Sequence, residues 1–218
     1  MASQCFQPIK GRVFRMTRLD ECGAPVVGAS SVVANGFISI SGSLDYEDGE
    51  EFTRKDAWGD LCLNEKDCPA LKRLNLDLMV CTIDPEAVEI AAGNRLITEA
   101  GDSIGFFGSE DRVCSGFSLE VWQKAKGPTC DPLTPTWAYW LFPWVTNTKI
   151  GDVEIANSPL EFSMTAETAG SGAQAGTLGP YDTLPVGNLL TATDHYALFL
   201  SATQPPAATC GAGAYVAP

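Results

Sequence analysis

Several segments of the chain alternate between apolar and polar residues, which is the spacing of a β-strand with one buried face. In residues 37–47, isoleucine, leucine and tyrosine fall on one face, and serine, aspartate and glutamate fall on the other. The segments 72–82, 117–124 and 160–165 show the same alternation. A slip of one residue would move polar side chains into the core, so one-sided burial also fixes the register. We therefore expect a strand in each segment.

Turn signals and apolar runs predict further strands. Asp48–Gly49 is a strong turn signal, so residues 50–55 should return beside residues 37–47 as the second strand of a hairpin. Residues 136–145 form an apolar run with three of the five tryptophans. This run predicts a strand covered on both faces, or a strand at a subunit contact. Shorter strands are expected at residues 12–17, 104–108 and 196–201.

One short helix is expected after the strand at 72–82. Asp84 is a good N-cap, Pro85 suits the first helical position, and Glu86 suits the positive end of the helix dipole. Gly93 is a natural C-terminal stop. The segment between them is so short that packing on a sheet must stabilise the helix.

Together these elements predict a mainly β fold, a β-sandwich or half-barrel with one short α-helix. Residues 1–202 are expected to form a single domain, with an N-terminal arm at residues 1–15 and a long irregular loop at about residues 50–70. Residues 203–218 are expected to be a C-terminal arm or tail.

The charge balance excludes one class of partner. The chain has 14 basic and 27 acidic residues, a net charge of −13. Tight binding to nucleic acid depends on lysine and arginine neutralising phosphates, so it is not expected.

The longest apolar run is far shorter than the roughly 20 residues that span a bilayer. The N-terminal residues lack the apolar core of a signal peptide, so we expect assembly in the cytoplasm.

The eight cysteines leave three states open: free or buried thiols, disulfides in the mature particle, or a metal site. No CxxC pair occurs, and the single histidine, His195, gives a zinc site little support. If a disulfide forms, Cys62–Cys68 is the shortest local closure, and Cys5–Cys22 would tie down the N-terminal arm.

The sequence lacks the parts of an enzyme site. His195 follows Asp194, but no GxSxG motif accompanies them. The acidic residues 45–51 lack the ligand spacing of a calcium loop, and both nucleotide-binding glycine motifs are missing. We therefore expect no catalysis, no cofactor and no metal. Aromatic residues 137–144 fit either a sugar-binding platform or core and interface packing.

Four segments carry a resemblance to a known family: RLDECGAPVVG (18–28), GFISI leading into YEDGEEF (36–52), LCLNEKDCPALKRLNLDL (61–78) and IDPEAVEIAAG (83–93). With them the chain resembles the major tail protein, or tail tube subunit, of long-tailed (siphovirus-type) bacteriophages, and most closely those of actinobacterial phages. The resemblance covers roughly the first 100 residues.

The resemblance implies a non-enzymatic virion protein of the phage tail. Members form hexameric rings that stack into a tube, and their inner sheets join into a continuous β-barrel around the DNA channel. Loops and terminal arms bridge successive rings. The implied partners are other copies of the chain, the tape-measure protein, the tail terminator and the baseplate or distal tail proteins. DNA would pass through the lumen during ejection without specific binding, and no membrane insertion is implied.

Mapped onto this chain, the resemblance implies an inner sheet at residues 37–47 with a return strand at 50–55. The lumen-facing candidates are the acids Asp45, Glu47 and Glu120, for which ordinary solvated surface acids are the alternative. The inter-ring loop candidates are Glu50, Glu51, Arg54, Lys55 and Trp58. Two other functions stay open: a capsid decoration or head–tail connector protein with an Ig-like sandwich, and a carbohydrate-binding β-module that uses the aromatic run.

Overall fold

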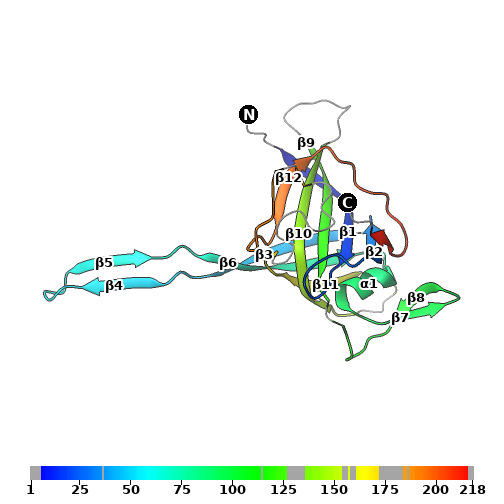
Figure 1. Ribbon diagram of the computed structural model, residues 1–218, viewed down its shortest axis with the longest axis horizontal. Helices are drawn as coiled ribbons and strands as arrows, with labels where there is room; N and C mark the ends of the chain where they lie inside the picture. The colour runs from blue at the N-terminus through cyan, green and yellow to red at the C-terminus, as the bar shows by residue number, and fades with distance from the viewer. Residues whose placement is uncertain are drawn as a thin grey trace.

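The computed structural model describes residues 6–35, 37–113, 115–126, 136–153, 157, 161–171, 184–185 and 187–215. It is mainly β: one large antiparallel sheet, two small two-stranded sheets and one short helix (Figure 1). The elements are β1 (Gln7–Arg18), β2 (Gly28–Ala34), β3 (Phe37–Glu47), β4 (Glu51–Lys55), β5 (Leu61–Lys66), β6 (Ala70–Val80), α1 (Pro85–Ala92), β7 (Leu96–Glu99), β8 (Asp102–Phe106), β9 (Phe117–Lys126), β10 (Thr136–Ile150), β11 (Phe162–Thr168), β12 (Ala197–Ser201) and β13 (Gly213–Tyr215). With eight residues, α1 is too short to cross a bilayer, and no longer helix occurs in the described part of the chain.

The large sheet runs in the order β13-β2-β1-β9-β10-β11-β6-β3 and does not close into a barrel among the described strands. Its longest strand, β10, has 15 residues and links two parts of the sheet. One edge of β10 pairs with β9, while its first half also pairs with β12 and its end with β11. The sheet curls so far that β3 approaches β1, where the rings of Phe14 and Phe37 meet edge to face at 5.8 Å.

The core lies between the two parts of the curled sheet. It contains buried side chains of β1, β2, β9 and β10 on one side, side chains of β6 and β11 on the other, and the apolar face of α1. A smaller cluster on the opposite face of β9 and β10 includes Trp122, Tyr139 and Leu141, covered by Leu190. Because β9 is covered on both faces, the expected exposure of its polar side chains is wrong: Ser118 and Glu120 are fully buried. The expected two-sided covering of β10 is confirmed through Ala138, Tyr139, Leu141 and Phe142.

The helix begins and ends where the sequence predicts. The side chain of Asp84 accepts hydrogen bonds from the backbone N–H groups of Glu86 and Ala87, at 3.0 and 3.4 Å. Pro85 occupies the first helical position, and Gly93 ends the helix with a φ of 70°. A left-handed C-terminal residue is what glycine permits without a steric penalty.

The hairpin predicted at Asp48–Gly49 is wrong. β3 pairs with β6, and β4 continues beyond β3 to pair with β5, so the four strands form one long hairpin that projects from the body (Figure 1). Its turn lies at residues 56–60, where the Asp56 carboxylate accepts from the N–H groups of Trp58 and Asp60, both at 2.9 Å. The irregular loop expected at residues 50–70 is therefore a regular β-hairpin. Pairing continues past Asp48–Gly49, where the N–H of Asp67 donates to the carbonyl of Glu50 at 3.0 Å, so the chain does not reverse there.

Most of the described residues in the two predicted terminal arms do not form arms but lie against the rest of the chain. From Gln7 onward the expected N-terminal arm is β1, which lies between β2 and β9. The described part of the C-terminal segment folds back on the chain: β13 pairs with β2, and the N–H of Gly211 donates to the Asp84 carboxylate at 2.8 Å. The ends of both arms, residues 1–5 and 216–218, lie outside the described residues.

Candidate functional site

β3 has one unpaired edge, because it is the last strand in the sheet order. The register confirms the predicted alternation from Ile40 to Leu44, whereas a register shift between Phe37 and Ser39 interrupts it at Ile38, so that Phe37 packs on the core side. Ile40, Gly42 and Leu44 lie opposite Leu78, Leu76 and Leu74 of β6 on the core side. Ser41 and Ser43 lie opposite Asp77 and Asn75 on the outer side. The outer side of β11, β6 and β3 is thus a polar surface beside an open strand edge.

An ion-pair bridge crosses this polar surface. Arg73 of β6 donates through Nε to the carboxylate of Asp45 on β3 at 2.9 Å, and through Nη1 to Glu167 on β11 at 3.0 Å. The hydrogen bond to Asp45 and then the charge of Glu167 raise the pKa of Arg73, so the guanidinium stays charged. Asn147 adds a donor to Glu167 at 3.2 Å. Asp45, a lumen candidate, is therefore compensated by Arg73 and is not an isolated acid.

The other two lumen candidates differ from each other. Glu47 is exposed at the end of β3, where β3 leaves the sheet. Glu120 has no exposed surface, because the second face of β9 is covered, and it forms an ion pair with Arg15. A buried carboxylate cannot line a water-filled channel, so the assignment of Glu120 to the lumen is wrong.

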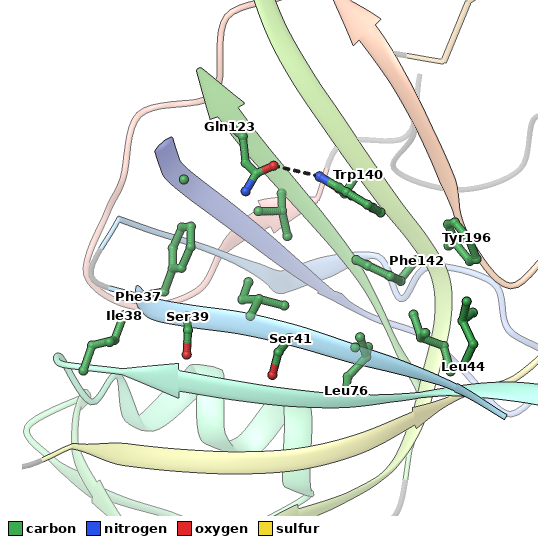
Figure 2. Close-up of a pocket in the computed structure, with 15 residues that line it drawn as sticks. Phe37, Ile38, Ser39, Ser41, Leu44, Leu76, Gln123, Trp140, Phe142 and Tyr196 are labelled. Atoms are coloured by element: carbon green, nitrogen blue, oxygen red, sulfur yellow. Dashed lines mark hydrogen bonds between the residues drawn. The ribbon is translucent and has the colours of Figure 1, made fainter. Parts of the chain in front are cut away.

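A groove of about 470 Å³ lies on the core side of β3, where the curled sheet remains open. Figure 2 shows Phe37, Trp140 and Phe142 pointing into the space between β3 and the β9–β10 part of the sheet, while Ser39 and Ser41 point away from it. Trp140 is held in place by its indole N–H, which donates to the side-chain oxygen of Gln123 at 2.9 Å. The groove wall is otherwise mainly apolar.

The aromatic run of β10 does not form a single flat platform. Trp140 and Phe142 face the groove with nearly parallel rings. Tyr139 lies on the opposite face, packed against Trp122 and Phe199. Strand alternation separates the aromatic side chains of this run in the way that it separates any neighbouring residues.

All five residues expected in the inter-ring loop lie on the projecting hairpin or at its base, and all are exposed: Glu50, Glu51, Arg54, Lys55 and Trp58. The register of β4 and β5 gives the hairpin two different faces. Phe52 lies opposite Glu65 and Arg54 lies opposite Leu63, so these four residues share one face. A register shift after Arg54 pairs Leu61 with Lys55 on the other face. Trp58, in the turn, is 91% exposed.

The Cys62–Cys68 disulfide is not formed, since both thiols are free and exposed. Cys62 lies in β5 and Cys68 lies beyond its end. An extended strand rises about 3.3 Å per residue, so six residues separate the two α-carbons by about 20 Å. A disulfide needs them within about 7 Å. The expected partner pair Cys5–Cys22 involves a residue outside the described part of the chain.

The Asp194–His195 pair does not have the geometry of a catalytic dyad. His195 is buried and its Nδ1 lies 3.0 Å from the hydroxyl of Thr168. The carboxylate of Asp194 instead accepts from the N–H of Thr191 at 2.6 Å. His195 therefore contacts the end of β11, and Asp194 stabilises the turn that precedes β12.

Sequence reasoning missed Arg73 and Glu167 as members of the polar surface, and Tyr196 as part of the groove. Arg73 and Glu167 are 94 positions apart, and only the pairing of β6 with β11 brings them together. The one local signal that could have identified Arg73 and Glu167 was the alternation, because each occupies a polar position of an alternating strand.

Comparisons with known proteins add no relative. A scan against protein-family models found no match to this chain. A search of curated proteins also found none.

Proposed function

We propose that this chain is a structural subunit of a bacteriophage tail tube, which assembles into hexameric rings that stack around a DNA channel. The observation that carries the proposal is the unpaired edge of β3, which borders a polar surface on a chain that also projects a long exposed hairpin. The sequence resemblance to tail tube subunits of long-tailed phages supports the same conclusion.

The open edge favours lateral assembly. An exposed strand of 11 residues presents a row of unpaired backbone donors and acceptors, which invites pairing with another chain. In a ring, each β3 edge would pair with a neighbouring subunit, and closure of the ring would leave no open edge. The β11-β6-β3 part of the curled sheet, as one layer of a sandwich or half-barrel, would then supply the continuous inner wall.

The polar surface suits the wall of a wet channel. Its described charges are Asp45, Asp77 and Glu167 against Arg73, which leaves an excess of negative charge. Screening limits this field to about 8 Å at physiological salt, so only charges close to the wall repel DNA. Such a surface lets DNA slide without binding it.

The projecting hairpin takes the role that the resemblance gave to the inter-ring loop. It reaches beyond the body of the subunit, as a contact between successive rings requires (Figure 1). The tape-measure protein inside the tube, and the terminator and baseplate proteins at its ends, remain the proposed partners. In this proposal the chain is not an enzyme, acts in the virion tail and assembles in the host cytoplasm.

Negative-stain electron microscopy of the purified chain at increasing concentration tests the proposal. We expect rings or tubes with a central hole. A capsid decoration or connector protein would instead give isolated particles or single rings that do not stack. A monodisperse monomer that binds glycans would overturn the proposal in favour of a carbohydrate-binding module.

A hairpin variant separates folding from assembly. Replacing residues 48–69 with a two-residue Asn-Gly turn joins β3 directly to β6, whose pairing already continues to the base of the hairpin. Because residues 51–70 are exposed throughout, the variant should fold with an unchanged melting temperature and should not form stacked tubes. Tubes of normal length from this variant would exclude the hairpin from stacking.

A further inference from the structure

We propose that the open edge of β3 pairs with the end of β10, residues 146–150, of a second copy of this chain, with Lys149 of one copy opposite Asp45 of the next. The inference rests on the proposed tail tube function, in which β3 pairs with a neighbouring subunit, and it names the surface that receives β3. Strand order, strand direction and the side chains of the two edges carry it.

The end of β10 has an edge that no described strand covers. β9 pairs with β10 only as far as Val145, which lies opposite Phe117, whereas β10 continues to Ile150. On its other edge this end of β10 pairs with β11. On the β9 side, Arg112 of the preceding loop donates to the carbonyl of Thr148 at 3.3 Å. A side chain therefore reaches this edge at a level where a strand would otherwise pair with it.

β3 and the end of β10 lie on opposite sides of one layer. The layer runs from the end of β10 through β11 and β6 to β3, and each of its three pairings is antiparallel. β3 and β10 therefore run in opposite directions within every copy. Copies in a ring all face the same way, so an edge that opens on one side of the layer must meet an edge that opens on the other side. The end of β10 meets this condition and gives an antiparallel seam.

The other described edges suit a ring less well. β12 pairs with the same edge of β10 as β11 does, so its open edge faces the same way as that of β3, and pairing these two would turn one copy over. The first half of β1 opens on the opposite side, because β2 pairs only with Phe14–Thr17. That half contains Pro8, which has no N–H, and register shifts at Ile9 and Arg12. β13 opens on that side too, but it has only three residues.

The strand pairings fix the level of each residue across the layer. Lys149 lies level with Ser41, through Thr165 and Asp77. Placing Lys149 opposite Asp45 therefore staggers neighbouring copies by four residues across the four strands of the layer. With about 3.3 Å per residue and about 4.8 Å per strand, this stagger tilts the strands by about 35°, as in closed β-barrels. Because the stagger is even, the apolar and polar sides of the two copies stay aligned.

This register also covers apolar surface on the core side of the layer. Ile150 comes to lie opposite Leu44, which is 44% exposed although it faces the core side of β3. Ile150 faces the same side, since it lies opposite Met164 within its own copy, and it is half-buried. Contact between the two side chains removes apolar surface of both from water, which favours the seam.

Opposite charges meet on the polar side of the layer. Lys149 lies opposite Thr165 on that side, is exposed, and has no salt bridge to a described residue. Asp45 and Glu47 share the polar side of β3 by strand alternation. Arg73 pairs with Asp45, whereas Glu47 is exposed and forms no salt bridge in the described part of the chain. Opposite Asp45, Lys149 is diagonal to Glu47, where opposite charges stabilise a strand pair.

Photocrosslinking identifies the seam directly. A photoreactive benzoylphenylalanine replaces Ser43, on the edge strand, in one preparation, and Asn75, its partner on β6, in the matched control. Assembled protein is made from a mixture of ¹⁵N-labelled and unlabelled chains, irradiated and analysed by mass spectrometry. We expect crosslinks from position 43 to peptides containing residues 146–151, between labelled and unlabelled chains. Position 75 lies one strand further from the edge, so it should crosslink only within its own chain.

A charge exchange provides a second readout. Lys149→Glu should weaken association at least about tenfold in sedimentation velocity at low salt, because it places like charges across the seam. Adding Glu47→Lys should restore association. Lys126→Glu, at an exposed cation on the end of β9, is the matched control and should change little. The melting temperature of each monomer should stay close to that of wild type, which separates loss of the seam from loss of the fold.

The outcomes distinguish the seam from the tail tube function. Assembled tubes whose position-43 crosslinks lie outside residues 146–151, or within one chain, would overturn the seam and leave the tail tube function standing. Failure of Glu47→Lys to restore association would also overturn the seam in this register. Seam crosslinks in closed rings that never stack would support the seam and overturn the tube. A wild-type chain that remains monomeric at every concentration would overturn both.

Discussion

Arg15 and Glu120 form a two-pronged ion pair across the β1–β9 ladder, with Nε to Oε2 at 2.5 Å and Nη2 to Oε1 at 2.7 Å. The carboxylate is fully buried and also accepts from the hydroxyl of Tyr139, while the guanidinium lies over the Trp122 ring. A buried charge of this kind is tolerable only when it is paired and hydrogen-bonded. Glu120 is thus a structural group of the sheet.

Removing Glu120 should therefore destabilise the subunit. Glu120→Ala leaves Arg15 as an uncompensated cation against the core, which typically costs about 3–5 kcal/mol. Urea unfolding measures the change. The matched control is Glu47→Ala, an exposed acid, for which we expect a change within about 0.5 kcal/mol. Equal, small effects of both substitutions would contradict the structural role of Glu120.

Arg73→Met should show that the bridge across the polar surface is electrostatic. Arg73 joins Asp45 and Glu167 at a partly exposed position, where salt screens the attraction. We expect the variant to be less stable than wild type at 10 mM NaCl, and the difference to shrink at 1 M NaCl. Lys72→Met, at a neighbouring cation without a described salt bridge, is the control. A salt-independent difference for Arg73→Met would indicate lost packing instead.

Asp84 joins the helix to the C-terminal segment, since its carboxylate caps α1 and also accepts from Gly211. Asp84→Ala removes both functions and should cost about 1–2 kcal/mol. Hydrogen exchange should accelerate at residues 209–215. Asp84→Asn keeps one acceptor oxygen, so its effect should be intermediate. Unchanged exchange in the C-terminal segment of the alanine variant would show that β13 and the hydrogen bonds from Thr209 to Val33 and from Ala212 to Glu86 hold it without Asp84.

Gly93→Ala should test the C-terminal cap of the helix. Gly93 has a φ of 70°, and a β-carbon there would lie 2.0 Å from the carbonyl oxygen of Val113. Gly101 has a φ of 99° but faces open space, so Gly101→Ala isolates the backbone strain, about 1–3 kcal/mol. We expect Gly93→Ala to lower the melting temperature further than Gly101→Ala. The reverse order would contradict the close approach of Val113.

Local signals predicted the local structure well. Asp84, Pro85 and Gly93 defined the helix because capping depends on residues within one turn. Alternation in residues 37–47 and 72–82 predicted strands with one apolar face, because strand parity is a property of the backbone itself. Those two segments pair with each other as β3 and β6, a partnership that the sequence did not indicate.

Non-local features required the folded chain. The Asp48–Gly49 turn does not form, because the β3–β6 ladder continues into β4 and β5 and the chain reverses only at residues 56–60. The alternation placed Glu120 on the polar side of its strand, but a second layer covers that face of β9. The alternation along a strand predicts which side of the sheet a residue faces. Whether that side is exposed to water depends on what packs against it.

The sequence by itself determined the helix, the strands with a clear apolar pattern, the apolar and polar faces of β3 and the acidic charge of the hairpin, whereas β2, β5, β7 and β13 carried no such pattern. Tertiary structure decided which strands pair, that the sheet curls without closing, and that a groove and a long exposed hairpin are left uncovered. The physical reason is distance along the chain. Propensity, capping and parity act over a few residues, whereas strand pairing and the covering of a sheet face join segments as far apart as Arg15 and Glu120.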